Sequence, residues 1–189
     1  MRNMTLLMFP IGQCLGTHFT GTAESQVHQV RLGSEIVELT AEEFTVWALA
    51  HSLPDDSGPW ERSRIIDLLT DSEITNGAVL IDRLLSRSLL AEVDLDSPAG
   101  FATRHRLLPL HLGLGNTAGT PTMFRSGTLE LALAGMTRTL YDLWLSGHLS
   151  PNLLIACKEH DAELPAVLTA LHSLLAPTAA CLDLAVQEF

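Results

Sequence analysis

The sequence predicts an α+β fold rich in helix, built as two consecutive domains with the same order of elements. Three observations lead to this prediction. The stretch VRLGSEIVELTAEEFTVWALA is typical of a strand that turns into a capped helix, two more helices and two short strands follow it, and a shorter version of this order begins again at Phe124. An internal repeat changes the expected fold more than a single motif does.

Composition and charge narrow the class of protein. The chain has 189 residues and a formal net charge of −11 at pH 7, and Lys158 is its single lysine. Since polyanion binding gains most of its affinity from neutralised phosphates, this acidity disfavours strong non-specific binding to nucleic acid. No apolar run approaches the ~20 residues of a membrane-spanning helix. We therefore expect an acidic protein that does not enter a membrane.

The cysteines and the N-terminus indicate a cytoplasmic protein. Cys14, Cys157 and Cys181 are an odd number without tight spacing, which fits neither a disulfide framework nor a zinc site. The apolar segment after Arg2 is short and contains Pro10, unlike an export signal. We expect reduced thiols in a cytoplasmic chain.

The first domain is expected over residues 25–112, after an extended N-terminal arm at 1–24 that is rich in glycine and threonine. Alternating apolar residues from 26 to 40 predict one bent strand or a short hairpin. Thr40 and Glu43 form a capping box, which starts a helix with Phe44, Trp47 and Ala48 on its apolar stripe.

Two more helices and a pair of strands complete this domain. Ser57 as cap and Pro59 in the first turn predict a helix over 59–70. A third helix is predicted over 76–88, with one apolar face made by Ala78, Ile81, Leu84 and Leu85. Residues 89–93 and 100–107 are expected to form two strands joined by a turn at 94–99.

This order of elements resembles the winged-helix, or winged helix-turn-helix, superfamily. The resemblance rests on the strand before Thr40, the three helices, the paired strands after Leu89, and the segment LIDRLLSRSLLAEV, in which a leucine-rich helix ends just before a strand. It covers about half of the chain and indicates no particular family. It implies that the third helix is the recognition helix and that the two strands form the wing.

The second half of the chain repeats this order in a degenerate form. A connector rich in glycine is expected at 113–123, and a second helical, winged-helix-like domain at 124–189. Arg125-Ser126-Gly127 corresponds to Arg31-Leu32-Gly33, and a helix over 136–146 corresponds to the helix that follows Thr40. The tandem repeat predicts two related domains.

No arrangement of residues predicts catalysis. Cys157 and His160 lie three residues apart, but two candidate ligands are too few for a zinc site, which takes ~3–4 from the protein. A buried thiol beside a surface histidine is the preferred interpretation. We expect no enzymatic activity, no cofactor and no metal.

Binding hypotheses of two classes remain. The first is a regulatory or scaffold protein that acts through protein–protein association, with another protein or with a second copy of itself. The alternative is a DNA-binding transcription regulator, acting as a dimer on double-stranded DNA through the third helix and the wing. Its base-reading residues would be Thr75, Asn76, Val79 and Arg83, and its other DNA contacts would come from Arg62, Arg64, Arg87, Arg104 and Arg106. Asp82 in the middle of the reading face and the nearby acids weigh against this alternative.

Overall fold

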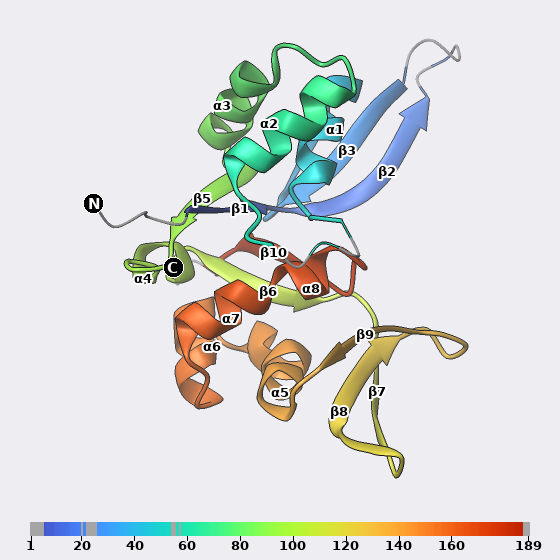
Figure 1. Ribbon diagram of the computed structural model, residues 1–189, viewed down its shortest axis with the longest axis vertical. Helices are drawn as coiled ribbons and strands as arrows, with labels where there is room; N and C mark the ends of the chain where they lie inside the picture. The colour runs from blue at the N-terminus through green and yellow to red at the C-terminus, as the bar shows by residue number, and fades with distance from the viewer. Residues whose placement is uncertain (1–5, 20, 22–25, 54–55, 57, 187–189) are drawn as a thin grey trace. The chain divides into compact units, whose positions relative to one another are not determined.

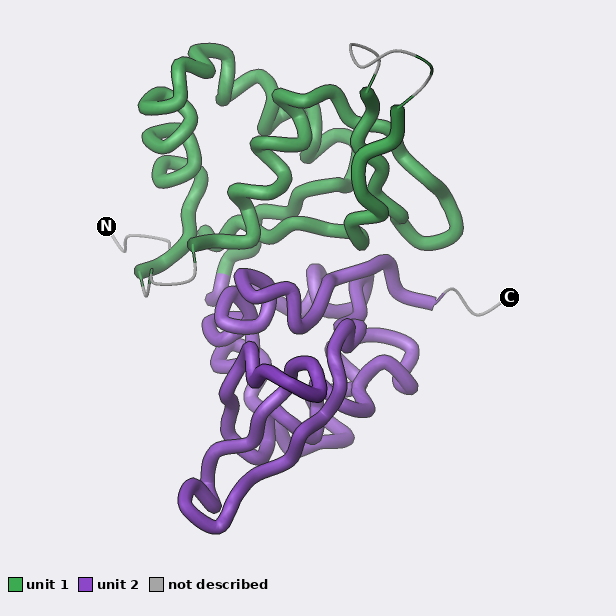
Figure 2. The backbone as a smooth tube through the Cα atoms, turned by 90° about the vertical axis from the view of Figure 1, so that its right-hand side faces the viewer, with its two compact units in different colours: residues 1–94 green, residues 95–189 purple. Residues whose placement is uncertain are grey.

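The protein has a mixed fold of the α+β class, with 36% helix and 34% strand. The computed structural model describes residues 6–19, 21, 26–53, 56 and 58–186 (Figure 1). Helix and strand are nearly equal, whereas we expected helix to dominate, because much of the expected arm and connector is strand. The chain divides into two compact units, residues 1–94 and 95–189 (Figure 2).

The described residues of unit 1 form two small antiparallel sheets and three helices. Its elements are β1 (Leu6–Pro10), β2 (Gln13–Phe19), β3 (Gln26–Leu32), β4 (Glu35–Leu39), α1 (Ala41–Leu49), α2 (Arg62–Asp71), α3 (Gly77–Ser86) and β5 (Leu90–Asp94). Strands β2, β3 and β4 form a meander, and β1 pairs with β5. The first and last strands therefore close the unit.

Unit 2 has the same order of strands around its helices. Its elements are α4 (Ala99–Ala102), β6 (His105–Pro109), β7 (Leu112–Thr117), β8 (Thr120–Gly127), β9 (Ala132–Met136), α5 (Arg138–Ser146), the 3-10 helix η1 (Gly147–Leu149), α6 (Leu153–Glu159), α7 (Leu164–Ala170), α8 (His172–Leu175) and β10 (Ala180–Leu184). Strands β7, β8 and β9 form the meander, and β6 pairs with β10.

The helix after each meander is held in the same way in the two units. α1 begins after Thr40 and α5 after Thr137, and each threonine hydroxyl accepts a hydrogen bond from a backbone N–H in the first turn. Both helices bury a tryptophan on the same turn. Trp47 Nε1 donates to Ile11 O at 3.0 Å, and Trp144 Nε1 donates to Ala179 O at 2.9 Å.

An aromatic row joins each of these helices to its meander. In unit 1, His28 on β3 stacks on Phe44 at 4.3 Å between ring centroids, and Phe44 lies 5.8 Å from Trp47. In unit 2 the corresponding distances are 5.1 Å from Phe124 to Tyr141 and 5.7 Å from Tyr141 to Trp144. The covered face of each sheet is thereby fixed.

The link from the last helix to the last strand also has the same backbone conformation in the two units. Ser88 and Thr178 have positive φ values of 58° and 55°, which non-glycine residues seldom adopt. The next residue closes the helix end in both units, with Leu89 N donating to Leu84 O and Ala179 N to Leu174 O.

The expected wing does not form. β5 pairs with β1 and β6 pairs with β10, so the two strands expected at 89–93 and 100–107 do not pair with each other, and Ala99–Ala102 is helical. Each strand instead pairs with a more apolar one. Leu7, Met8 and Phe9 of β1 are buried at 3% exposure or less, and this pairing also shields Val93 of β5.

The first expected helix start is confirmed, and other expected boundaries shift. The capping box of Thr40 and Glu43 is present. The expected arm contains β1 and β2, and the expected connector contains most of β7 and the start of β8, where Gly115 with φ +65° marks a bulge. α2 starts at Arg62 with Glu61 at its N-cap, and Ser57 lies outside the described residues.

Unit 2 contains one buried hydroxyl that should lower its stability. Ser126 on β8 is 0% exposed, and its Oγ has no hydrogen-bond partner among the described residues. Val30, and not Leu32 as expected from the sequence repeat, occupies the corresponding position of β3, because Val30 is paired with β4 as Ser126 is paired with β9. A buried, unpaired polar group is costly.

We predict that Ser126→Ala raises the free energy of unfolding by about 1 kcal/mol, because it removes this unpaired hydroxyl. Chemical denaturation followed by circular dichroism measures the change. Ser150→Ala is the control, because the buried Ser150 hydroxyl donates to Glu159 and its removal should be destabilising. A loss of stability in Ser126→Ala as large as in the control would contradict the prediction.

Candidate functional site

α3 is the element on which the expected DNA-reading residues lie. It packs closely on α2, since a Cβ on Gly77 would lie 2.8 Å from Leu69 Cδ1. Its buried residues are Gly77, Leu80, Ile81 and Leu84. The expected core face is thus correct for Ile81 and Leu84, but Ala78 is exposed and Leu85 is only half-buried. The buried face of α3 is rotated toward Gly77, because only a glycine at this position lets α3 lie this close to α2.

The residues expected to face outward do so. Thr75, Asn76 and Val79 are exposed, as are Asp82, Arg83 and Ser86. Val79 is 59% exposed, and Asn76 Nδ2 lies 3.4 Å from Glu42 Oε2 on α1. The surface is therefore accessible, and its chemistry depends on the charges around it.

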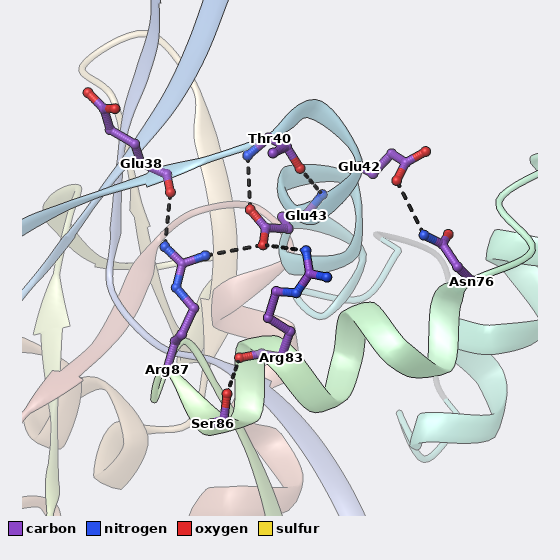
Figure 3. A network of polar contacts seen from close by, with 8 residues as sticks. All are labelled: Glu38, Thr40, Glu42, Glu43, Asn76, Arg83, Ser86 and Arg87. Atoms are coloured by element: carbon purple, nitrogen blue, oxygen red, sulfur yellow. Dashed lines mark hydrogen bonds and ion pairs between the residues drawn. The ribbon is translucent and has the colours of Figure 1, made fainter.

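Two of the expected DNA-contacting arginines bind one buried carboxylate (Figure 3). Arg83 Nη1 lies 3.4 Å and Arg87 Nη1 3.2 Å from Glu43 Oε1, and the Glu43 side chain is 5% exposed. The other oxygen, Oε2, accepts from Thr40 N at 3.0 Å, and Arg87 Nη2 donates to Glu38 O. The network ties α3 to the start of α1 and to the end of β4.

The charges of this network favour the ionised carboxylate. Burial alone would raise the pKa of Glu43, but the hydrogen bond from Thr40 N and the charges of Arg87 and Arg83 outweigh it and hold the pKa below its usual value. Glu43 thus stays charged at neutral pH and neutralises part of the arginine charge beside α3.

The arginines of α2 are also paired with acids. Arg62 Nη2 lies 2.6 Å from Asp82 Oδ1 and Arg62 Nη1 3.9 Å from Glu92 Oε2. Arg64 Nη2 lies 3.0 Å from Asp56 Oδ2. Hence all four expected DNA-contacting arginines of unit 1 have a carboxylate within 4 Å.

The two arginines expected on the wing belong to unit 2. Arg106 on β6 lies 3.7 Å from the fully buried Asp183 of β10. Arg104 is exposed and makes no ion pair within the described part of the chain. The nine expected residues therefore fall on two separate units, seven on the first and two on the second.

The β7–β9 meander has an apolar surface that was not predicted from the sequence. Phe124 and Met136 face α5, so by strand alternation Met123 and Leu133 lie on the opposite face. On this outer face Leu112 is 52% exposed, Met123 49% and Leu133 36%. In the turn between β8 and β9, Leu129 and Leu131 are 83% and 60% exposed. The alternation in LELALAGM was the available signal.

The corresponding face of unit 1 is more polar, although Ile36 on it is 60% exposed. Gln13, at the position of Leu112, accepts hydrogen bonds from Arg31, and Gln29 donates to Glu38 at 3.3 Å. Glu38 and Gly135 each lie two residues before the helix-capping threonine. The two units thus share a backbone plan and differ in the chemistry of this face.

The Cys157 and His160 pair has the structure of a packing site. Cys157 is 2% exposed, and burial raises the pKa of its thiol to about 11, so the thiol is protonated at neutral pH. His160 Nε2 lies 3.2 Å from Ser146 Oγ. The described residues contain no group of three or more His, Cys, Asp or Glu side chains that could hold a metal ion.

Comparisons with known proteins assign no family to this chain. Neither protein-family models, nor curated proteins, nor solved structures give a match to this chain. Among the described residues, no helix combines the length and apolar character needed to span a membrane.

We predict that Glu43→Gln destabilises unit 1 by about 2 kcal/mol at pH 7, because glutamine keeps the helix cap but leaves Arg83 and Arg87 without a carboxylate. The lowered pKa of Glu43 fixes the pH dependence. The stabilisation is fully present above the ordinary value of 4.5 and is lost as the pH falls through the lower folded-state pKa. Denaturation curves at a series of pH values measure both effects.

The matched control is Glu42→Gln, one residue earlier on the same helix, where the carboxylate is exposed and contacts only Asn76 among the described residues. Its effect should stay within about 0.5 kcal/mol. Equal effects of the two substitutions would show that the network adds nothing beyond helix capping.

Proposed function

We propose that this chain is a non-enzymatic regulatory or scaffold protein that acts through protein–protein association and is built from two duplicated, permuted winged-helix units. The observation that carries the proposal is the contrast between its two surfaces. The arginines around α3 are neutralised by carboxylates, whereas the outer face of the β7–β9 meander exposes apolar side chains.

The pairing of strands in unit 1 supports the winged-helix relationship. A winged helix has three helices and a small sheet in which the two wing strands pair. Here β5 follows α3 as a first wing strand would, and β1 pairs with it from the start of the unit. Met8 N on β1 also donates to Trp60 O between α1 and α2, at 2.8 Å. We infer that β1 takes the place of the second wing strand.

Matching details in the two units support a duplication. The capping threonines, the buried tryptophans and the positive φ values before the last strands recur at corresponding places. The bulges after Cys14 and after Gly113 do so as well. Side chains that define backbone geometry have been kept, while the exposed faces have diverged.

The charge arrangement disfavours the DNA-binding alternative. A protein that binds duplex DNA gains affinity when its cations displace counterions from phosphates. Arg62, Arg64, Arg83 and Arg87 would first have to leave carboxylates. Asp82 also lies on the exposed face that would enter the groove, where it would repel phosphates. Association with protein needs none of these arginines.

We predict no binding of the full chain to random duplex DNA, even at about 20 mM salt, where phosphate contacts are strongest. Fluorescence anisotropy with a labelled duplex measures this. Binding that weakens steeply with added salt would support the transcription regulator and overturn the proposal.

Association itself is tested by photocrosslinking in the cells that make the protein. A benzoylphenylalanine at Leu131 should give adducts with a polypeptide, whereas the same group at Ile36 on the polar face of unit 1 should not. Both positions are 60% exposed, so accessibility is matched. Absence of any polypeptide adduct at Leu131 would contradict association through this face.

A further inference from the structure

We infer that the partner on the apolar face of unit 2 is a second copy of the chain, which pairs antiparallel with the free edge of β9. This inference rests on the proposed function and names the partner of that same surface. It would join two β7–β9 meanders into one continuous sheet across a twofold axis.

The edge position of β9 is the first observation. The strand order of the meander is β7-β8-β9, so among the described residues β9 has a paired strand on one side only. An edge strand offers backbone N–H and C=O groups to another strand, and proteins protect such edges with charges or bulges. β4 is the corresponding edge in unit 1 and has Glu35 and Glu38, whereas β9, ALAGM, has no charge and has a bulge at Leu133.

The charge balance is the second observation, and it favours a copy of the same chain. Residues 112–136 contain Arg125 and Glu130 as their only charged residues, within a chain of net charge −11. Two acidic chains repel each other unless they meet through a neutral surface. A twofold contact also needs a self-complementary patch, which one arginine and one glutamate can provide.

The shape of the edge indicates the register. Pairing about Ala134 places Leu133 of each copy, the extra residue of the bulge in β9, opposite Gly135 of the other. Residues directly opposite in an antiparallel pair point to the same face. Gly135 leaves room on the outer face, where its nearest neighbour is the Met123 side chain. Leu133 of one copy would thus lie over Gly135 and against Met123 of the other.

Sedimentation velocity of the full chain tests the inference. The wild type is expected to change from monomer to dimer over about 1 to 300 μM, and Leu133→Lys is expected to weaken the dimer at least about tenfold. Ile36→Lys is the matched control, because Ile36 and Leu133 each lie four residues before a capping threonine. It should leave the dimer unchanged.

A disulfide tests the register without relying on a destabilising substitution. In a Cys14→Ser background, which removes the exposed thiol, Ala134→Cys should give a covalent dimer on oxidation, since paired residues of antiparallel strands lie within disulfide range. Val37→Cys on β4 should not, although Val37 and Ala134 occupy corresponding, half-buried positions.

Each outcome has a separate meaning. A wild type that stays monomeric at every concentration, a dimer that survives Leu133→Lys, or equal losses in the two lysine variants would overturn the self-pairing. In the photocrosslinking experiment, an adduct at Leu131 with a different polypeptide would overturn self-pairing and leave the proposed function standing. No adduct at all would overturn both the self-pairing and the proposed function.

Discussion

The antiparallel pairing of the first strand of each unit with its last strand is the constraint on which the rest of the structure depends. β1 meets β5 and β6 meets β10, so each unit is closed by segments far apart in sequence. The closure continues beyond the ladders, with Ile11 N bonded to Leu89 O and Leu110 N to Ala179 O. In each unit the buried tryptophan also donates to a carbonyl at this junction. Helix, meander and closing strands are thereby held at one point.

Local chemistry explains which parts of this arrangement could be predicted from the sequence. The Thr40 and Glu43 capping box and the outward residues of α3 follow from contacts within a few residues, and the structure bears them out. Strand partners do not follow from local chemistry. β5 and β6 are close in sequence and look like a hairpin, but a long-range partner gives each a more apolar neighbour. The sequence does not reveal which of two possible partners buries more apolar surface.

The candidate DNA surface likewise depends on a long-range contact that the local sequence does not predict. The positions of Arg83 and Arg87 on α3 could be predicted, but the burial of Glu43 between them could not, because that carboxylate comes from the start of α1. Pairing changes the meaning of these arginines. An arginine held by a buried carboxylate fixes the packing of two helices. The carboxylate already neutralises most of the arginine charge, so little of it is available to a phosphate. Counting arginines along a helix therefore overestimates its capacity for nucleic acid.

The two units also act as a comparison within one molecule. They share caps, aromatic rows and closing strands, so one backbone plan is compatible with two different surfaces. Where unit 1 has Gln13 and Glu38, unit 2 has Leu112 and Gly135, and β9 lacks the two glutamates that β4 has. An exposed, uncharged edge favours association with another strand. Since unit 1 shows that the same backbone folds with a polar face, stability alone does not require the apolar one. We propose binding as the physical reason for it.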